Sequence, residues 1–196
     1  TLAPEKLPRD CEGKDLIFLE IKEADFEYVY ETLLSKLEGV GEDDIFQMTA
    51  AQCHALRMEV PRAVFERNTK MGVTKKGTDV QVATKDFSKL LAYYREMTKI
   101  GVEYNLFGHF GDAHLHFNFM PSPDKERLCQ DSLLGLYDKV HDWNGSPFAE
   151  HGIGFLKKPF IQKFYSHTQT ALFKILKQQY DPKNHFFPQG FMGESK

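Results

Sequence analysis

Residues 103–120 read EYNLFGHFGDAHLHFNFM and predict a β-hairpin. Residues 103–107 and 113–120 resemble two strands, and residues 108–112 between them contain two glycines and can form a tight turn. Because side chains alternate between the two faces of a strand, the second segment has a polar and an apolar face. The polar face carries Asp112, His114, His116 and Asn118, and the apolar face carries Leu115, Phe117 and Phe119. This division indicates a sheet that packs on a core with one side and lines a site with the other; the alternative is a plain solvent-facing strand.

The rest of the chain predicts a mixture of strands and helices around this hairpin. The expected strands are residues 15–21, 45–48 and 78–83. The expected helices are residues 26–37, two helices within 49–68 that meet at Pro61, and residues 87–97, 124–140 and 161–179. This order is typical of an α+β fold, in which a mostly antiparallel sheet carries helices on one face and ferredoxin-like units recur. We expect residues 1–14 to be a linker and residues 15–196 to form one cap domain.

Composition excludes several classes of protein. The 196 residues are 41% hydrophobic and 27% charged, which is ordinary for a globular chain and excludes a wholly disordered one. A formal net charge of −3 argues against a nucleic-acid or membrane-surface binder. No apolar run approaches the ~18 residues that a membrane span requires. The odd, widely spaced Cys11, Cys53 and Cys129 predict free thiols in a reducing compartment such as the cytoplasm.

The histidines of the hairpin are candidate metal ligands. His109 ends the first strand and His116 lies in the second. Directly opposed residues of a hairpin have Cβ atoms roughly 5 Å apart, and two imidazoles held at such a distance suit a transition metal.

A second cluster follows at residues 150–154, which read EHGIG. Glu150 could complete a His/His/Glu set that leaves coordination positions for water or substrate. His151 could act as a general base near neutral pH, and the glycines would let the backbone approach a ligand closely. The alternative for this segment is a flexible surface turn.

Two basic residues are weaker candidates. Arg57 has the bidentate geometry that binds a carboxylate, and Lys76 precedes a glycine. For each of them, a solvated or ion-paired surface group is the alternative. The sequence contains no phosphate-binding loop, dinucleotide-binding turn or nucleophile elbow.

The pattern Gly108-His109-x-Gly111-Asp112-x-x-Leu115-His116-x-Asn118, followed about thirty residues later by residues 150–154, resembles the C-terminal domain of FAD-linked oxidases. This family includes D-lactate dehydrogenase, the flavoprotein subunit of glycolate oxidase and D-2-hydroxyglutarate dehydrogenase. Residues 76–80 and Asp181-Pro182 also fall where that domain has similar stretches, so the resemblance extends from about residue 15 to the C-terminus.

The resemblance implies a fold and a set of roles. The domain would be an α+β cap over the flavin, and His109, His116 and Glu150 would bind a divalent metal, commonly zinc. His151 would take the hydroxyl proton of a small 2-hydroxy acid, whose hydride passes to the flavin. The remaining substrate contacts would come from Arg57 and Lys76, which would bind the carboxylate, and from Asn118.

This chain departs from the family at three places. Ala113-His114 stands where the family usually has Gly-Asn, which adds a third imidazole to the hairpin. Residues 186–190 lack the Asn of the family's Asn-Pro-Gly stretch near the flavin. The FAD-binding domain, normally N-terminal, is not part of the sequence, so we expect this chain to be the C-terminal part of a longer flavoenzyme and to be inactive alone. An electron acceptor is a further expected partner, and the oligomeric state is open between monomer and homodimer.

Two other functions remain open at this point. The chain could be a free-standing hydrolase that uses His109, His116 and Glu150 with a zinc-bound water, or a non-catalytic docking module with the same fold. Hydrolysis of an ester or amide by the isolated chain would favour the first of these. An absence of metal, with Arg57 far from His151, would favour the second.

Overall fold

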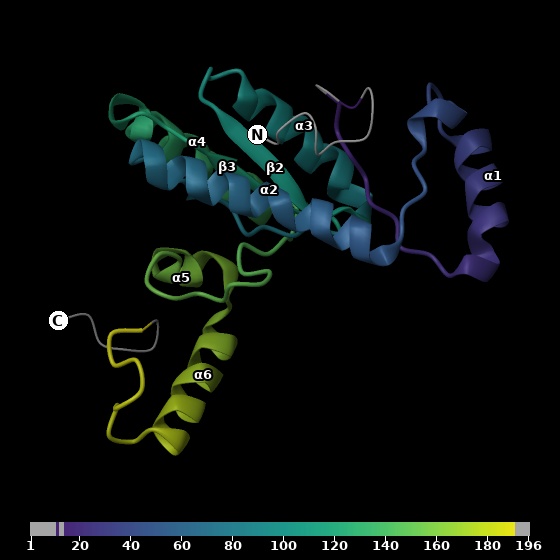
Figure 1. Cartoon of the computed structure of the whole chain (residues 1–196). Helices are drawn as coiled ribbons and strands as arrows, with labels where there is room; N and C mark the ends of the chain where they lie inside the picture. The colour runs from purple at the N-terminus through teal and green to yellow at the C-terminus, as the bar shows by residue number, and fades with distance from the viewer. Residues whose placement is uncertain (1–10, 12–13, 191–196) are drawn as a thin grey trace. The chain divides into compact units, whose positions relative to one another are not determined.

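The computed structural model describes residue 11 and residues 14–190, and it divides the chain into two compact units (Figure 1). The first unit is Thr1–Gly72 and the second is Val73–Lys196. We describe each unit by itself. Most of the predicted linker, residues 1–14, lies outside the described residues, and the assignment of residues 15–196 to one cap domain stays a prediction.

The described residues of the first unit form helices and no strand. The helices are α1 (Phe26–Lys36), α2 (Ala50–Met71) and the short 3₁₀ turns Glu23–Asp25 and Glu42–Asp44. The helix predicted over residues 26–37 is therefore confirmed, and the strands predicted at residues 15–21 and 45–48 are wrong. A strand requires a neighbouring strand that pairs with its backbone N–H and C=O groups, and the described residues of this unit offer none. The apolar side chains of Ile17 and Leu19 lie exposed instead of packing on a sheet.

Helix α2 runs without interruption through Pro61, so the predicted break there is wrong. Thr49 and Gln52 form a capping box at its start, and Gly72 ends it in the left-handed conformation with φ 65°. Proline removes one backbone hydrogen bond of a helix, and here the 22-residue helix tolerates that loss between two well-formed ends.

The second unit is a three-stranded antiparallel sheet with helices, which confirms the α+β fold class. Its strands are β1 (Lys76–Gly77), β2 (Tyr104–His109) and β3 (His114–Phe119), in the order β1-β3-β2. Its helices are α3 (Phe87–Thr98), α4 (Glu126–Asp142), α5 (Ile161–Phe164) and α6 (His167–Tyr180). The succession β1, α3, β2, β3, α4 is the strand–helix–strand–strand–helix unit that the sequence predicts.

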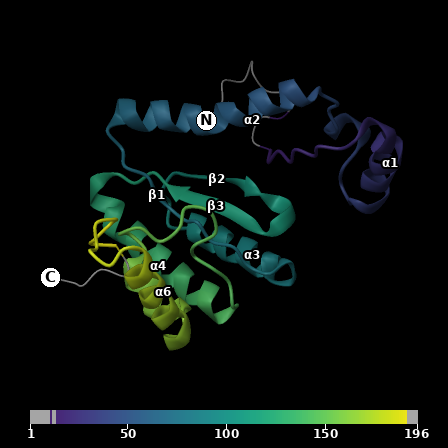
Figure 2. The same ribbon diagram turned by 90° about the horizontal axis from the view of Figure 1, so that it is seen from below.

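The core lies on one face of this sheet, where α3 and α4 pack side by side (Figure 2). The apolar face of β3 supplies Phe117 and Phe119, which are fully buried against Leu90 of α3 and Leu136 of α4. The alternation predicted for β3 therefore holds, and the opposite face of the strand is left for polar side chains.

The strand predicted at residues 78–83 is wrong, since within that range only Gln81 makes isolated β-bridges. Strand β1 ends at Gly77, and beyond it the chain follows β3 irregularly, with Gln81 bridging His114. The interruption has a local cause at Thr78. Its hydroxyl, instead of its backbone carbonyl, accepts the N–H of Phe117 at 2.9 Å, so the regular ladder stops there.

The helix predicted over residues 161–179 is divided at Tyr165, whose backbone is extended. Ser166 and Gln169 form a capping box that begins α6 afresh, with the Gln169 N–H donating to the Ser166 hydroxyl at 3.2 Å.

Two expectations about the chain as a whole can be compared with the structure. Cys11, Cys53 and Cys129 are free thiols, as predicted. Among the described residues, no helix combines the length and the apolar character that crossing a membrane would require.

Candidate metal centre

Three imidazoles share the polar face of the β2–β3 hairpin. In the register of the two strands His109 lies directly opposite His114, and His116 lies opposite Phe107. His114 and His116 are buried, whereas the side chain of His109 is 63% exposed. The centroids of the His114 and His116 rings are 4.6 Å apart. The hairpin therefore presents two buried imidazoles and one at the surface on the same side of the sheet.

Glu150 meets all three of these rings from the loop after α4. Its Oε1 lies 3.2 Å from His109 Nε2 and 3.4 Å from His114 Nδ1. Its Oε2 lies 3.3 Å from His116 Nε2. The structure therefore brings together the residues His109, His116 and Glu150 that the sequence proposed as metal ligands, and it adds His114 to them.

Taken one at a time, these three separations match the distance between neighbouring ligands of a tetrahedral ion. Nitrogen and oxygen ligands bind zinc at about 2.0–2.1 Å, which at tetrahedral angles puts neighbouring donor atoms roughly 3.3–3.4 Å apart. Among the described residues, mutual donor distances within 4.8 Å are found in two sets that share His116, and neither set includes His109 or joins His114 with Glu150. The sets are Asp79, His114 and His116, and His116, Glu150 and His151.

The orientation of His116 is set by a backbone carbonyl. His116 Nδ1 lies 3.1 Å from the carbonyl oxygen of Thr78. Because a carbonyl can only accept, Nδ1 carries the hydrogen and Nε2 of the neutral ring presents its lone pair to Glu150. Two lone-pair atoms 3.3 Å apart repel each other unless a proton or a cation lies between them. The hydrogen bond from His116 Nδ1 to the Thr78 carbonyl is of the kind that usually supports a metal-binding histidine through its second ring nitrogen.

Asp79 fixes the loop that carries Glu150 and His151. Its Oδ1 accepts the backbone N–H of Glu150 at 3.0 Å, and its Oδ2 accepts that of His151 at 3.0 Å. Lys157 also donates to Oδ2. Burial raises the pKa of Asp79, but the hydrogen bonds from Lys157 and the two backbone N–H groups outweigh it, so the pKa lies below its usual range. Asp79 is therefore a buried anion that holds the site loop in place.

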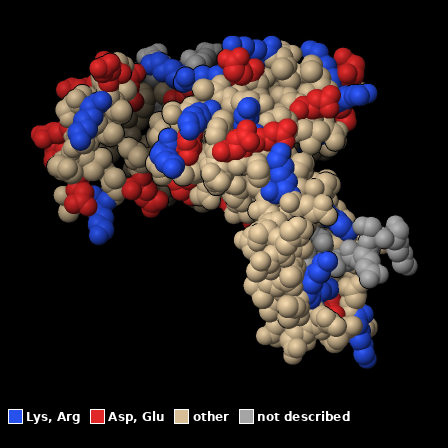
Figure 3. Space-filling model, turned by 180° about the vertical axis from the view of Figure 1, so that it is seen from behind, with Lys and Arg blue, Asp and Glu red and all other residues tan. Residues whose placement is uncertain are grey.

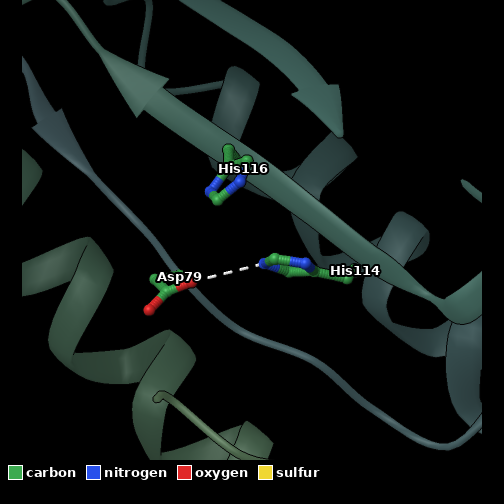
Figure 4. A group of neighbouring side chains, drawn as sticks. All are labelled: Asp79, His114 and His116. Carbon is green, nitrogen blue, oxygen red and sulfur yellow. Dashed lines mark ion pairs between the residues drawn. The ribbon is translucent and has the colours of Figure 1, made fainter. Parts of the chain in front are cut away.

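Asp79 is the site residue that sequence reasoning missed, whereas His114 was placed on the polar face of the hairpin without a role. Figure 4 shows the Asp79 carboxylate pointing toward the His114 ring, with Asp79 Oδ1 at 3.3 Å from His114 Nε2. The angle is outside that of a hydrogen bond, and His114 Nε2 is buried without a hydrogen-bond partner among the described residues. A signal for His114 existed in the alternation of the strand. No sequence signal indicated the role of Asp79, because the backbone N–H groups that it accepts lie more than 70 residues away.

His151 and Asn118 are both neighbours of the buried His116. The side chain of His151 is 70% exposed, with Nε2 4.0 Å from Glu150 Oε2 and its ring 5.6 Å from that of His116. Asn118 follows His116 on the same face of β3 and is buried. It lies opposite Gly77, where a Cβ atom would come within 2.0 Å of the Asn118 Oδ1.

Of the other two predicted site residues, Lys76 lies on the opposite face of the sheet from this cluster. Lys76 lies opposite Phe119 in the sheet, on the face that packs against the helices, and its ammonium is 3.1 Å from Glu126 of α4. Arg57 lies exposed on α2, in the first unit. The roles of both residues in binding a carboxylate stay predictions.

Comparisons with known proteins point to one family. Residues 4–189 match the family "FAD linked oxidases, C-terminal domain". A D-2-hydroxyglutarate dehydrogenase of Stutzerimonas stutzeri is 32% identical over 81 residues, which are 39% of this chain and 18% of that protein. The glycolate oxidase subunit GlcD of Bacillus subtilis is 22% identical over 187 residues, 91% of this chain and 39% of that protein.

A further relative is the mitochondrial D-lactate dehydrogenase [cytochrome] of Kluyveromyces lactis, 26% identical over 107 residues, which are 54% of this chain and 19% of that protein. The matches thus span less than two fifths of the length of each of these three relatives. Because the family match covers nearly the whole sequence, the chain belongs to the FAD linked oxidases, C-terminal domain family.

Proposed function

We propose that this chain is the substrate- and metal-binding cap domain of a longer FAD-dependent enzyme that oxidises a small 2-hydroxy acid to the 2-oxo acid. The observation that carries the proposal is the convergence of His109 and His116 on Glu150, 3.2 and 3.3 Å from its two oxygens. The names of the relatives support the substrate class, since they specify D-2-hydroxyglutarate, glycolate and D-lactate.

A divalent cation, commonly zinc in such a donor set, would be held by His109, His116 and Glu150. The fit rests on the donor separations and on the Thr78 carbonyl, which leaves the His116 Nε2 lone pair aimed at the site. When bound, the ion lowers the pKa of a hydroxyl group that it contacts by several units. The exposed position of His109 gives the substrate access to this side of the hairpin.

We assign to His151 the role of receiving the hydroxyl proton. Its Nε2 lies at the edge of the cluster, 4.0 Å from Glu150, and its ring is largely open to solvent. A neutral imidazole has the right basicity near pH 7, and an exposed ring can pass the proton on to water. Asp79 positions this base, because it holds the backbone N–H of His151.

The polar face of the hairpin also offers amides to a polar substrate. Asn118 lies opposite Asn105, and both polar side-chain atoms of Asn105 are buried without a hydrogen-bond partner among the described residues. Buried polar groups without partners are costly, and the hydroxyl and carboxylate oxygens of a 2-hydroxy acid would satisfy such amides. We assign Asn118 to this contact. Arg57 and Lys76 stay proposed contacts of the substrate carboxylate, although the Lys76 side chain lies on the helix face of the sheet, where its ammonium is 3.1 Å from Glu126.

The redox step requires groups beyond this chain. FAD supplies the capacity to accept the hydride of the substrate, which no side chain of the protein has. The flavin would be held mainly by another domain of the longer chain, and an electron acceptor would reoxidise it. The free thiols fit a reducing compartment, the cytoplasm or another one.

Metal content tests the proposal. The 196-residue chain, loaded with zinc and desalted, should retain about one ion per chain, whereas His109→Ala and His116→Ala should each lose it and keep their helix content by circular dichroism. His167→Ala, an exposed histidine at the start of α6, is the matched control and should retain the ion. Stoichiometric zinc in the double variant would exclude this site. Metal-dependent ester hydrolysis by the chain alone would favour the hydrolase instead.

The role of His151 is tested in the longer flavoenzyme. His151→Asn should keep the ion and slow turnover of the hydroxy acid by roughly 10²–10⁴-fold, which is the range for loss of a general base. An unchanged turnover rate would remove His151 from that role.

A further inference from the structure

We infer that His114 is a fourth protein ligand of the proposed cation site, so that the centre consists of three imidazoles and one carboxylate. This inference rests on the proposed function, because it concerns the same ion. It assigns His114 Nδ1 to the coordination sphere and Asp79 to the outer support of that ring.

The first argument is the direction of the His114 ring. Its two nitrogens face two different carboxylates, Nε2 toward Asp79 at 3.3 Å and Nδ1 toward Glu150 at 3.4 Å. The ring is almost completely buried, with 3% of its side chain exposed. A neutral imidazole has one N–H and one lone pair, so one of the two nitrogens must face its carboxylate without a hydrogen.

The surroundings of Asp79 decide which nitrogen that is. The Asp79 carboxylate already accepts from two backbone N–H groups and from Lys157. Its charge is therefore balanced by the lysine ammonium, and a metal ion beside it would be repelled by that ammonium. Asp79 is thus better suited to accept the Nε2–H of His114 than to bind the ion.

This assignment leaves the Nδ1 lone pair of His114 aimed at Glu150. His116 shows the same relation with its nitrogens exchanged, since the Thr78 carbonyl takes Nδ1–H and Nε2 faces Glu150. Consecutive residues, Thr78 and Asp79, therefore orient the two buried rings so that both lone pairs converge on one carboxylate. A hydrogen-bonded second nitrogen is what metal-ligating histidines have in most sites.

The consequence is a more enclosed ion than two histidines would give. His109, His114, His116 and Glu150 would together supply the four ligands that zinc commonly takes, so the substrate would have less access to the ion than in a site with two histidines. His109 would be the ligand that can move away from the ion most easily, because its side chain is exposed whereas those of His114 and His116 are buried.

A count of imidazoles tests the inference without any activity measurement. X-ray absorption of the zinc-loaded 196-residue chain should show three histidine ligands, and that of His114→Asn should show two. The zinc affinity of His114→Asn should be lower by at least roughly 10–100-fold, because loss of an outer-shell partner alone has an effect of that size. His167→Asn is the matched control and should match the unmodified chain in both measurements.

The outcomes separate the two proposals. Two histidine ligands in the unmodified chain, or unchanged zinc affinity in His114→Asn, would overturn the fourth ligand while leaving the centre of His109, His116 and Glu150. Failure of the unmodified chain to bind zinc would overturn both proposals. If His114→Asn does not fold, as judged by circular dichroism, the ligand count of the unmodified chain decides.

Discussion

Thr78 shows how one side chain can interrupt a sheet and serve a site. Its hydroxyl accepts the N–H of Phe117, which a backbone carbonyl would take in a regular ladder. The Thr78 carbonyl is thereby left for His116 Nδ1 at 3.1 Å. The irregularity of residues 78–83 is therefore linked to the orientation of a candidate ligand.

Replacing Thr78 by valine keeps the shape of the side chain and removes the hydroxyl. The buried N–H of Phe117 then has no acceptor, and we expect the free energy of unfolding in urea to fall by about 1–3 kcal/mol. Thr170→Val, at a partly exposed position of α6, is the control and should have little effect. Equal stability of the two variants would show that the Thr78 hydroxyl is dispensable.

Gly77 allows the close approach of β1 to Asn118. A Cβ atom at this position would lie 2.0 Å from Asn118 Oδ1, so Gly77→Ala should displace the Asn118 amide. In the longer flavoenzyme we expect a higher KM for the hydroxy acid, with zinc content unchanged. The control is Gly111→Ala, because a Cβ atom at Gly111 would meet no atom within 4 Å beyond its own residue and its chain neighbours. Gly39→Ala is unsuitable, because φ is 80° at Gly39 and disfavours alanine. A KM like that of Gly111→Ala would argue against Asn118 as a substrate contact.

At the scale of elements, the sequence predicted what depends on local periodicity. The β2–β3 hairpin and helices α1, α3 and α4 follow patterns of period 2 or 3.6 and were found. The break before α6 was missed although Ser166 and Gln169 have the spacing of a capping box. The role of Asp79 could not be predicted, because it bonds backbone N–H groups 71 and 72 residues away and no local pattern reports such a contact.

The loop after α4 depends on the charge of Asp79. The pKa of Asp79 is lower in the folded chain than its ordinary value of 3.8, so its ionised form stabilises the fold. That contribution is complete above about pH 4 and is lost as the pH falls through the lower folded value. Asp79→Asn should remove it at every pH, which predicts faster hydrogen exchange at the amides of Glu150 and His151.

Hydrogen exchange of the two amides is measured near neutral pH in Asp79→Asn and in the unmodified chain. Asp138→Asn is the control, because Asp138 is an exposed acid that pairs with Lys163. Unchanged exchange at both loop amides in Asp79→Asn would show that the carboxylate does not hold the loop.

At the scale of the whole molecule, apolar side chains gather at the surface of α6 and the segments beside it. Figure 3 shows this part of the second unit as largely uncharged. The exposed residues there include Leu156, Leu172, Ile175, Tyr180 and Phe186. Exposed apolar patches of this kind bind apolar probes and promote association.

Ile175→Lys places a charge in this patch without disfavouring the helix, because lysine is a good helix former. We expect weaker fluorescence of an apolar dye such as ANS and less concentration-dependent light scattering than for the unmodified chain. Lys174→Gln, at the neighbouring position, is the control. Identical dye binding in Ile175→Lys and the unmodified chain would mean that the patch is not the binding surface.

The proposed ligands come from segments that meet only in the folded chain, since Glu150 follows His116 by 34 residues. An ion that binds such a set recognises the native state and has little affinity for the unfolded one. By mass action, zinc at a hundred times its dissociation constant would then stabilise the second unit by about 2.7 kcal/mol. The melting temperature should therefore rise with the logarithm of the free zinc concentration. Calorimetry would then report zinc binding even without a flavin or a substrate.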